Sequence, residues 1–159
     1  MKKVIIIGCP GGGKSTFARA LQKKTGLPLY HLDMLYWNAD RTTASRDVFD
    51  SRLDDILKKD EWIIDGNYGR TMERRICACD TVFFLDIPID VCLDGIKSRK
   101  GKARSDMPWI DDGGDEDFIS FVKDFEASSK PKILELLEKY ADKCVIVMHS
   151  REEIDDYLR

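Results

Sequence analysis

Short apolar runs alternate with amphipathic segments along the whole chain. The runs are rich in Val, Ile and Phe, which is typical of strands buried on both faces of a parallel sheet. Between them, apolar residues recur at the three- and four-residue spacing of helices that bury one face. This alternation predicts an α/β fold of three layers, α/β/α, around a roughly five-stranded parallel sheet. The expected strands are 3–7, 29–32, 62–64, 81–85 and 144–148.

Three stripes of apolar residues mark the clearest helices between these strands. They are Phe49, Leu53, Ile56 and Leu57; Phe118, Phe121, Val122 and Phe125; and Ile133, Leu136, Leu137 and Tyr140. The aromatic residues in such stripes are more often part of the core than of a ligand site. A last helix is expected to begin at Ser150, because Ser150 and Glu153 have the spacing of a capping box.

The most specific motif follows the first predicted strand. Residues 8–15, GCPGGGKS, match the phosphate-binding loop pattern G-x-x-x-x-G-K-[ST] in full. Such a loop turns backbone N–H groups toward a phosphate, and the N-terminus of the following helix favours the anion. The pattern predicts that Lys14 reaches the β and γ phosphates of ATP and that Ser15 offers its hydroxyl to Mg²⁺. The expected nucleotide-binding residues are Gly8, Gly11, Gly12, Gly13, Lys14, Ser15 and Thr16.

Length and composition limit the remaining possibilities. At 159 residues, the chain fits a single domain, 1–159, with a net charge of -3 and 35% charged residues. This charge balance is unlike that of a protein that follows a DNA groove. We expect no membrane association and a cytoplasmic protein, because no apolar stretch approaches ~20 residues and no signal-peptide pattern is present. The five cysteines are odd in number and lack a C-x-x-C pair, which favours reduced core thiols.

A basic window interrupts this average composition. Residues 97–104, KSRKGKAR, contain no acidic residue, and the acidic run 111–117, DDGGDED, follows soon after. Since the window follows the fourth strand, where ligands collect in open α/β folds, it predicts a phosphate-contacting lid at 98–112. Arg99 and Arg104 are the expected catalytic contacts of that lid. The alternative is a solvated loop.

Two further segments carry a family resemblance. HLDMLYW at 31–37 and WIIDGNYGR at 62–70 are similar to the segments that follow strands two and three in adenylate kinases. With CDTVFFLDIP at 79–88 and the S-D-M-P ending of the basic stretch, the chain resembles small bacterial adenylate-kinase-related proteins, also described as DNA topology modulation proteins linked to flagellin regulation. The resemblance implies a nucleoside monophosphate kinase-like P-loop fold with strand order 2-3-1-4-5 and a short lid. It also implies that ATP and Mg²⁺ are used to phosphorylate a nucleotide or another small-molecule acceptor.

The chain departs from adenylate kinases at two places. Where those enzymes hold the AMP phosphate with an Arg, this chain has Tyr36 and Trp37, and the next Arg is Arg41. The arginines that reach the transferring phosphoryl group after the lid are missing too, since the sequence has no Arg between 105 and 150. Lys123, Lys130 or Lys132 would have to replace them as point charges without a bidentate fork.

Two carboxylates at predicted strand ends are the main candidates for chemistry. Asp65 is expected to support Mg²⁺ binding, and the alternative is a turn residue that satisfies local N–H groups. The resemblance to kinases of the shikimate type implies that Asp33 lies near the acceptor and orients or deprotonates its hydroxyl. A helix N-cap is the alternative for Asp33.

The expected acceptor site is completed by neighbours of these acids. Trp37 and Tyr68 can stack on a base or sugar, or pack on the core. Arg70 can hold an acceptor phosphate or ring, whereas Arg74 and Arg75 are expected in solvent. His31 and His149 are expected to be structural. A regulatory nucleotide-binding protein that modulates DNA topology is the alternative function, although direct DNA binding is not favoured.

Overall fold

Five parallel strands form one sheet in the computed structural model, which describes residues 1–99, 108 and 116–159. The strand order is β2-β3-β1-β4-β5, which confirms the predicted order 2-3-1-4-5. The strands are β1 (Lys3–Gly8), β2 (Leu29–His31), β3 (Trp62–Asp65), β4 (Thr81–Leu85) and β5 (Cys144–Met148). All carboxyl ends therefore meet at one edge of the sheet, where a ligand site is expected in this fold class.

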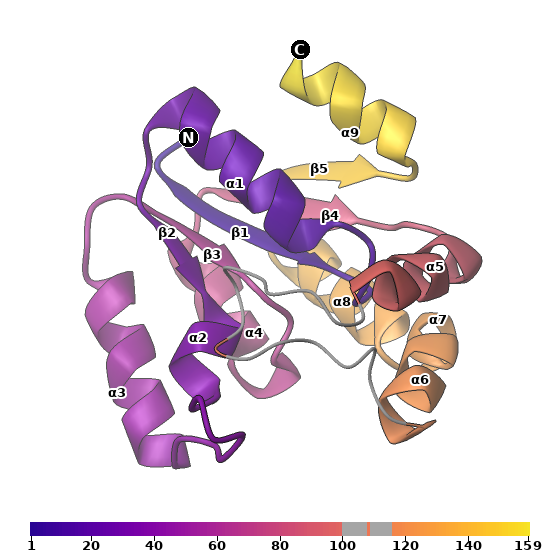
Figure 1. The fold of residues 1–159 in the computed structure, drawn as a ribbon. Coiled ribbons are helices and arrows are strands. Elements are labelled where there is room, and N and C mark those ends of the chain that lie inside the picture. Colours follow the sequence, from indigo (N-terminus) through magenta and orange to yellow (C-terminus); the bar gives the residue numbers. More distant parts are fainter. Residues whose placement is uncertain (100–107, 109–115) are drawn as a thin grey trace.

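Helices cover both faces of the sheet, with α1 and α9 on one face and α4 and α8 on the other (Figure 1). The described helices are α1 (Lys14–Thr25), α2 (Leu32–Tyr36), α3 (Arg46–Leu57), α4 (Gly69–Ala78), α5 (Ile89–Arg99), α6 (Glu116–Lys123), α7 (Phe125–Ser128), α8 (Lys130–Lys139) and α9 (Arg151–Leu158). Within the described ranges, no helix combines the length and apolar character needed to cross a bilayer.

The apolar runs of the sequence form the centre of the core. Residues 4–7 of β1 and 82–85 of β4 are fully buried, because helices pack on both faces of these central strands. The predicted strand boundaries hold to within one residue. Leu32, which was predicted to end the second strand, instead begins α2, where it is fully buried.

One predicted helical stripe is divided between two helices. Val122 and Phe125 are buried, but Phe121 is 43% exposed. The inward side of α6 is formed by Phe118, Ile119 and Val122, which leaves Phe121 off that side; α6 ends at Lys123 and a separate helix, α7, begins at Phe125. In contrast, the predicted Ser150 cap at the start of α9 is confirmed, since the Glu153 N–H donates to Ser150 Oγ (3.1 Å). The Glu153 carboxylate accepts from the backbone N–H of His149 (2.6 Å), one residue before the N–H that a capping box would use.

Candidate nucleotide-binding site

The glycine-rich loop lies at the carboxyl edge of the sheet, between β1 and α1. Gly11 has φ +86, and a Cβ at this position would lie 2.1 Å from the carbonyl oxygen of Cys92 on α5. Gly13 has φ +94 and is the N-cap of α1. Both positions favour glycine because left-handed backbone is strained for other residues, and at Gly11 the approach to α5 also leaves no room for a side chain. The loop therefore connects β1 to α1 and packs against α5.

Lys14 and Ser15 form the first turn of α1, directly after this loop. Lys14 Nζ lies 3.4 Å from the carbonyl oxygen of Cys9, so its ammonium group stays over the loop. The Ser15 hydroxyl donates to Asp65 Oδ2 at 2.8 Å. Thr16, the last residue of the predicted nucleotide set, is exposed one position further along the helix.

Asp65 connects this first turn to the neighbouring strands. It is the last residue of β3 and only 4% exposed. Its Oδ2 accepts from Ser15 and lies 2.7 Å from Nδ1 of His31, the last residue of β2. A hydroxyl and a carboxylate are hard oxygen groups of the kind that Mg²⁺ prefers, so the donor set fits the predicted metal.

Asn67 ties the segment after β3 to the start of the glycine-rich loop. Its side-chain Oδ1 accepts from the Gly8 N–H (3.0 Å), and its Nδ2 donates to the Gly8 carbonyl (2.6 Å). Both backbone polar groups of Gly8 are therefore paired with one amide side chain. Asn67 was not among the predicted site residues, because an Asn after Asp-Gly is also an ordinary turn signal.

Arg75 was predicted to lie in solvent, and this prediction is wrong. The side chain is fully buried and donates to the carbonyl oxygens of Gly66 (3.0 Å), Asn67 and Tyr68 (3.2 Å). Burial lowers the pKa of Arg75 to about 9, which still leaves the guanidinium charged at neutral pH. A signal was available: Arg75 follows Thr71 and Met72 at helical spacing on the buried face of α4.

Asp33 and Tyr68 meet beside this segment. The Tyr68 hydroxyl donates to Asp33 Oδ1 at 2.5 Å. Burial, with a smaller contribution from the Asp33 charge, raises the pKa of Tyr68, so the phenol keeps its proton. Asp33 is in the first turn of α2, whose N-cap is His31, so the structure does not give Asp33 the capping position.

Aromatic rings surround the Asp33–Tyr68 pair. The ring of Tyr36 lies 5.1 Å from that of Tyr68 and 5.2 Å from that of Trp37, between centroids. Phe49 of α3 closes the cluster, with its ring 5.4 Å from that of Tyr68. The structure therefore brings the predicted acceptor residues Asp33, Trp37 and Tyr68 into one region.

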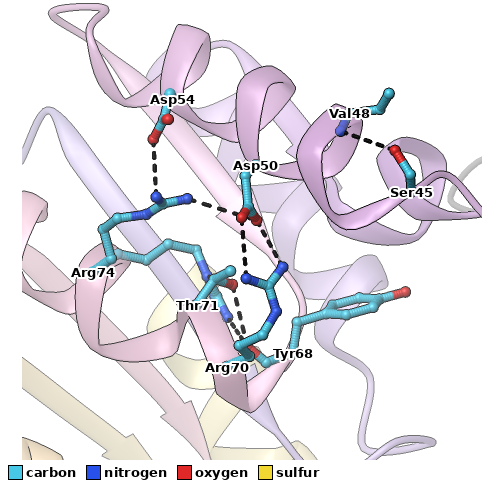
Figure 2. A network of polar contacts seen from close by, with 9 residues as sticks. Ser45, Val48, Asp50, Asp54, Tyr68, Arg70, Thr71 and Arg74 are labelled. Carbon is cyan, nitrogen blue, oxygen red and sulfur yellow. Dashed lines mark hydrogen bonds and ion pairs between the residues drawn. The ribbon is translucent and has the colours of Figure 1, made fainter.

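Arg70 faces α3 rather than an open acceptor site. Its guanidinium makes two hydrogen bonds to the Asp50 carboxylate, at 2.7 and 3.1 Å, and holds the pKa of Asp50 below its ordinary value. Figure 2 shows Asp50 between Arg70 and Arg74, with Arg74 also reaching Asp54 at 3.2 Å. Arg70 would have to leave this ion pair to bind an acceptor.

The predicted lid, 98–112, lies mostly outside the described residues. Arg104 is outside them, and for Arg99 the structure gives only its backbone place at the end of α5. Arg151, which was not among the predicted site residues, lies beside the glycine-rich loop. Arg151 Nη2 of α9 is 3.4 Å from the carbonyl oxygen of Gly11. Lys130, considered as a substitute for a missing arginine, pairs with Asp86 at 2.9 Å.

Comparisons with known proteins agree with this architecture. No protein-family model matches the chain. The adenylate kinase of Thermotoga neapolitana is 30% identical over 88 residues, which are 54% of this chain and 39% of that protein. The adenylate kinase of Thermotoga maritima is 28% identical over 88 residues with the same coverage. The matched part of the chain thus spans about two fifths of the length of these curated relatives.

A solved structure matches nearly the whole chain. The shikimate kinase of Bacteroides thetaiotaomicron has a TM-score of 0.58 and 18% sequence identity, and the match covers 98% of this chain and 93% of that one. Together, the sequence and structure matches indicate a P-loop fold of the nucleoside monophosphate kinase type.

Proposed function

We propose that the protein is an ATP- and Mg²⁺-dependent phosphotransferase that moves the γ-phosphoryl group of ATP to a nucleotide or another small-molecule acceptor. The observation that carries the proposal is the hydrogen bond between Ser15, in the glycine-rich loop motif, and the buried Asp65. The similarity to adenylate kinases and to a shikimate kinase fold supports it.

The nucleotide end of the proposed reaction depends on the loop and the first turn of α1. Backbone N–H groups of the loop and the Lys14 ammonium would bind the phosphates, and Ser15 with Asp65 would hold Mg²⁺. Magnesium bound with ATP would neutralise charge on the β and γ phosphates during transfer. Arg99 and Arg104 are proposed to contact the transferring group from the lid.

The acceptor end depends on Asp33 and its surroundings. A carboxylate repels a phosphate dianion but can orient a hydroxyl or accept its proton, so an acceptor hydroxyl fits Asp33 better than an acceptor phosphate. Tyr68 donates to Asp33 and would hold the carboxylate in place. The engagement of Arg70 with Asp50 supports the same preference, because a guanidinium already paired with a carboxylate is less available to a phosphate.

The test is a screen of nucleosides, nucleotides, sugars and small hydroxy acids with Mg·ATP, measuring ADP above a blank without acceptor. We expect at least one hydroxyl acceptor to raise ADP formation. Lys14→Ala should lower that turnover by about 10²–10³-fold, because it removes a cation from the charge that develops in transfer. Lys23→Ala, an exposed lysine at the other end of α1, is the matched control and should leave turnover unchanged.

Two results would contradict the proposal. One is the absence of ATP binding by the folded wild-type protein. The other is sequence-selective, submicromolar binding of duplex DNA that persists at physiological salt and in the presence of Mg·ATP, since nonspecific association should fade as salt rises. The second result would favour the alternative, a nucleotide-binding regulator of DNA topology.

A further inference from the structure

One carboxylate oxygen connects three elements of the sheet edge. Oδ2 of Asp65 on β3 accepts from the Ser15 hydroxyl of α1 at 2.8 Å and lies 2.7 Å from Nδ1 of His31 on β2. The side chain of His31 is 11% exposed and that of Asp65 is 5% exposed, and Ser15 is half-buried. His31 was predicted to be structural, but it contacts the same carboxylate oxygen as Ser15, a residue of the proposed magnesium site.

The chemistry of the groups sets the direction of both hydrogen bonds. An ionised carboxylate only accepts, so the imidazole must carry its proton on Nδ1 and the Ser15 hydroxyl must point its hydrogen at Asp65. The lone pairs of the Ser15 oxygen are then directed away from Asp65. A hydroxyl oriented in this way can present its lone pairs to a cation. A freely rotating hydroxyl would point its hydrogen toward the cation for part of the time.

We propose that His31 is a positioning residue for the magnesium-binding pair Ser15 and Asp65. By donating from Nδ1, it keeps the Asp65 carboxylate in the orientation that accepts the Ser15 proton. His31 thereby stabilises the binding of a magnesium nucleotide without touching the metal. This inference rests on the proposed function, because it assigns the site to Mg·ATP.

Metal-dependent nucleotide binding separates this role from a simple contribution to the fold. The measurement is the dissociation constant of ATP by titration calorimetry, with and without Mg²⁺, on the full chain. Groups that orient metal ligands typically change metal affinity by about 10–100-fold when they are mutated. We therefore expect His31→Ala to reduce the Mg²⁺-dependent gain in ATP affinity by about tenfold or more, while ATP affinity without metal changes little.

A pair of amide variants tests the geometry of the Nδ1 contact. The side-chain amide of Asn can place its N–H near the position of Nδ1, whereas the longer Gln places its N–H one bond further out. His31→Asn should therefore retain most of the Mg²⁺-dependent gain, and His31→Gln should lose it. His149→Ala is the matched control, because His149 is 61% exposed and lies beside Asp86 rather than Asp65.

The outcomes are distinct. If His31→Ala is folded and keeps the full Mg²⁺-dependent gain, the positioning role is wrong while the proposed function stands. If His31→Ala does not fold, the amide pair decides, and equal gains in Asn and Gln overturn the inference. If the wild-type protein binds no ATP with or without Mg²⁺, the proposed function fails and the inference fails with it.

Discussion

Gly95 lies against Gly11 of the glycine-rich loop, although the two are more than eighty residues apart in the sequence. It lies within α5, and a Cβ at this position would lie 2.2 Å from the carbonyl oxygen of Gly11. Gly11 in turn faces the carbonyl of Cys92 on the same helix. The loop and α5 therefore approach each other through backbone atoms, and Gly95→Ala inserts a methyl group into this close contact.

The expected cost is the difference between two opposing effects. Alanine is favoured over glycine within a helix by about 0.5–1 kcal/mol. Carbon–oxygen contacts are normally about 3.3 Å or longer, so the backbones must separate by about 1 Å. Overpacking of this kind costs roughly 1–3 kcal/mol. We expect a net destabilisation of about 1–2 kcal/mol, which corresponds to a fall in Tm of roughly 2–8 °C for a chain of this size.

Thermal unfolding and ATP titration together measure the effect. Because the displaced atom belongs to the glycine-rich loop, the proposed function predicts that ATP affinity falls along with Tm. Gly69→Ala is the matched control: it also places alanine in a helix, but no atom lies within 4 Å of the new Cβ. It should leave Tm unchanged or raise it slightly. A Gly95→Ala protein as stable as Gly69→Ala, with normal ATP affinity, would refute the reasoning.

Three further predictions concern the segment after β3 and its contacts. Arg75→Met should lower the free energy of unfolding by about 3 kcal/mol in urea titrations, because it leaves buried carbonyl oxygens of residues 66–68 without a donor; a loss below about 1 kcal/mol would contradict this. Tyr68→Phe should reduce the kcat/KM for the acceptor by about tenfold with ATP affinity unchanged, since it removes the hydrogen bond to Asp33. An equal loss of acceptor kcat/KM and of ATP affinity would indicate misfolding instead. Arg70 holds the pKa of Asp50 below its ordinary value of 3.8, so this pair contributes stability at neutral pH that is lost as the pH falls below about 4 and through the lowered pKa. Asp50→Asn should therefore show a shallower fall of Tm between pH 5 and 2 than the wild-type protein, and identical profiles would exclude a contribution from the pair.

The fold and the place of the glycine-rich loop could be predicted because their signals are local. Consecutive apolar residues such as 4–7 must be buried on both faces of a sheet wherever the chain places them, and this periodicity is visible in the sequence. The loop 8–15 is equally local, since its glycines and Lys14 act through their own backbone and their immediate neighbours. For this reason, strand boundaries and loop position agree with the structure to within one residue.

The contacts that hold the site together could not be predicted, because they join residues far apart in the chain. Ser15, His31 and Asp65 lie on α1, β2 and β3. Only the parallel packing of β2, β3 and β1 brings Ser15 and His31 to the same carboxylate oxygen of Asp65. The helical spacing of Arg75 with Thr71 and Met72 indicates that Arg75 is buried, but it does not indicate that carbonyl oxygens of the preceding segment compensate its charge. A side chain's partner depends on what lies opposite it in space, and this information arises only when the strands and helices have packed.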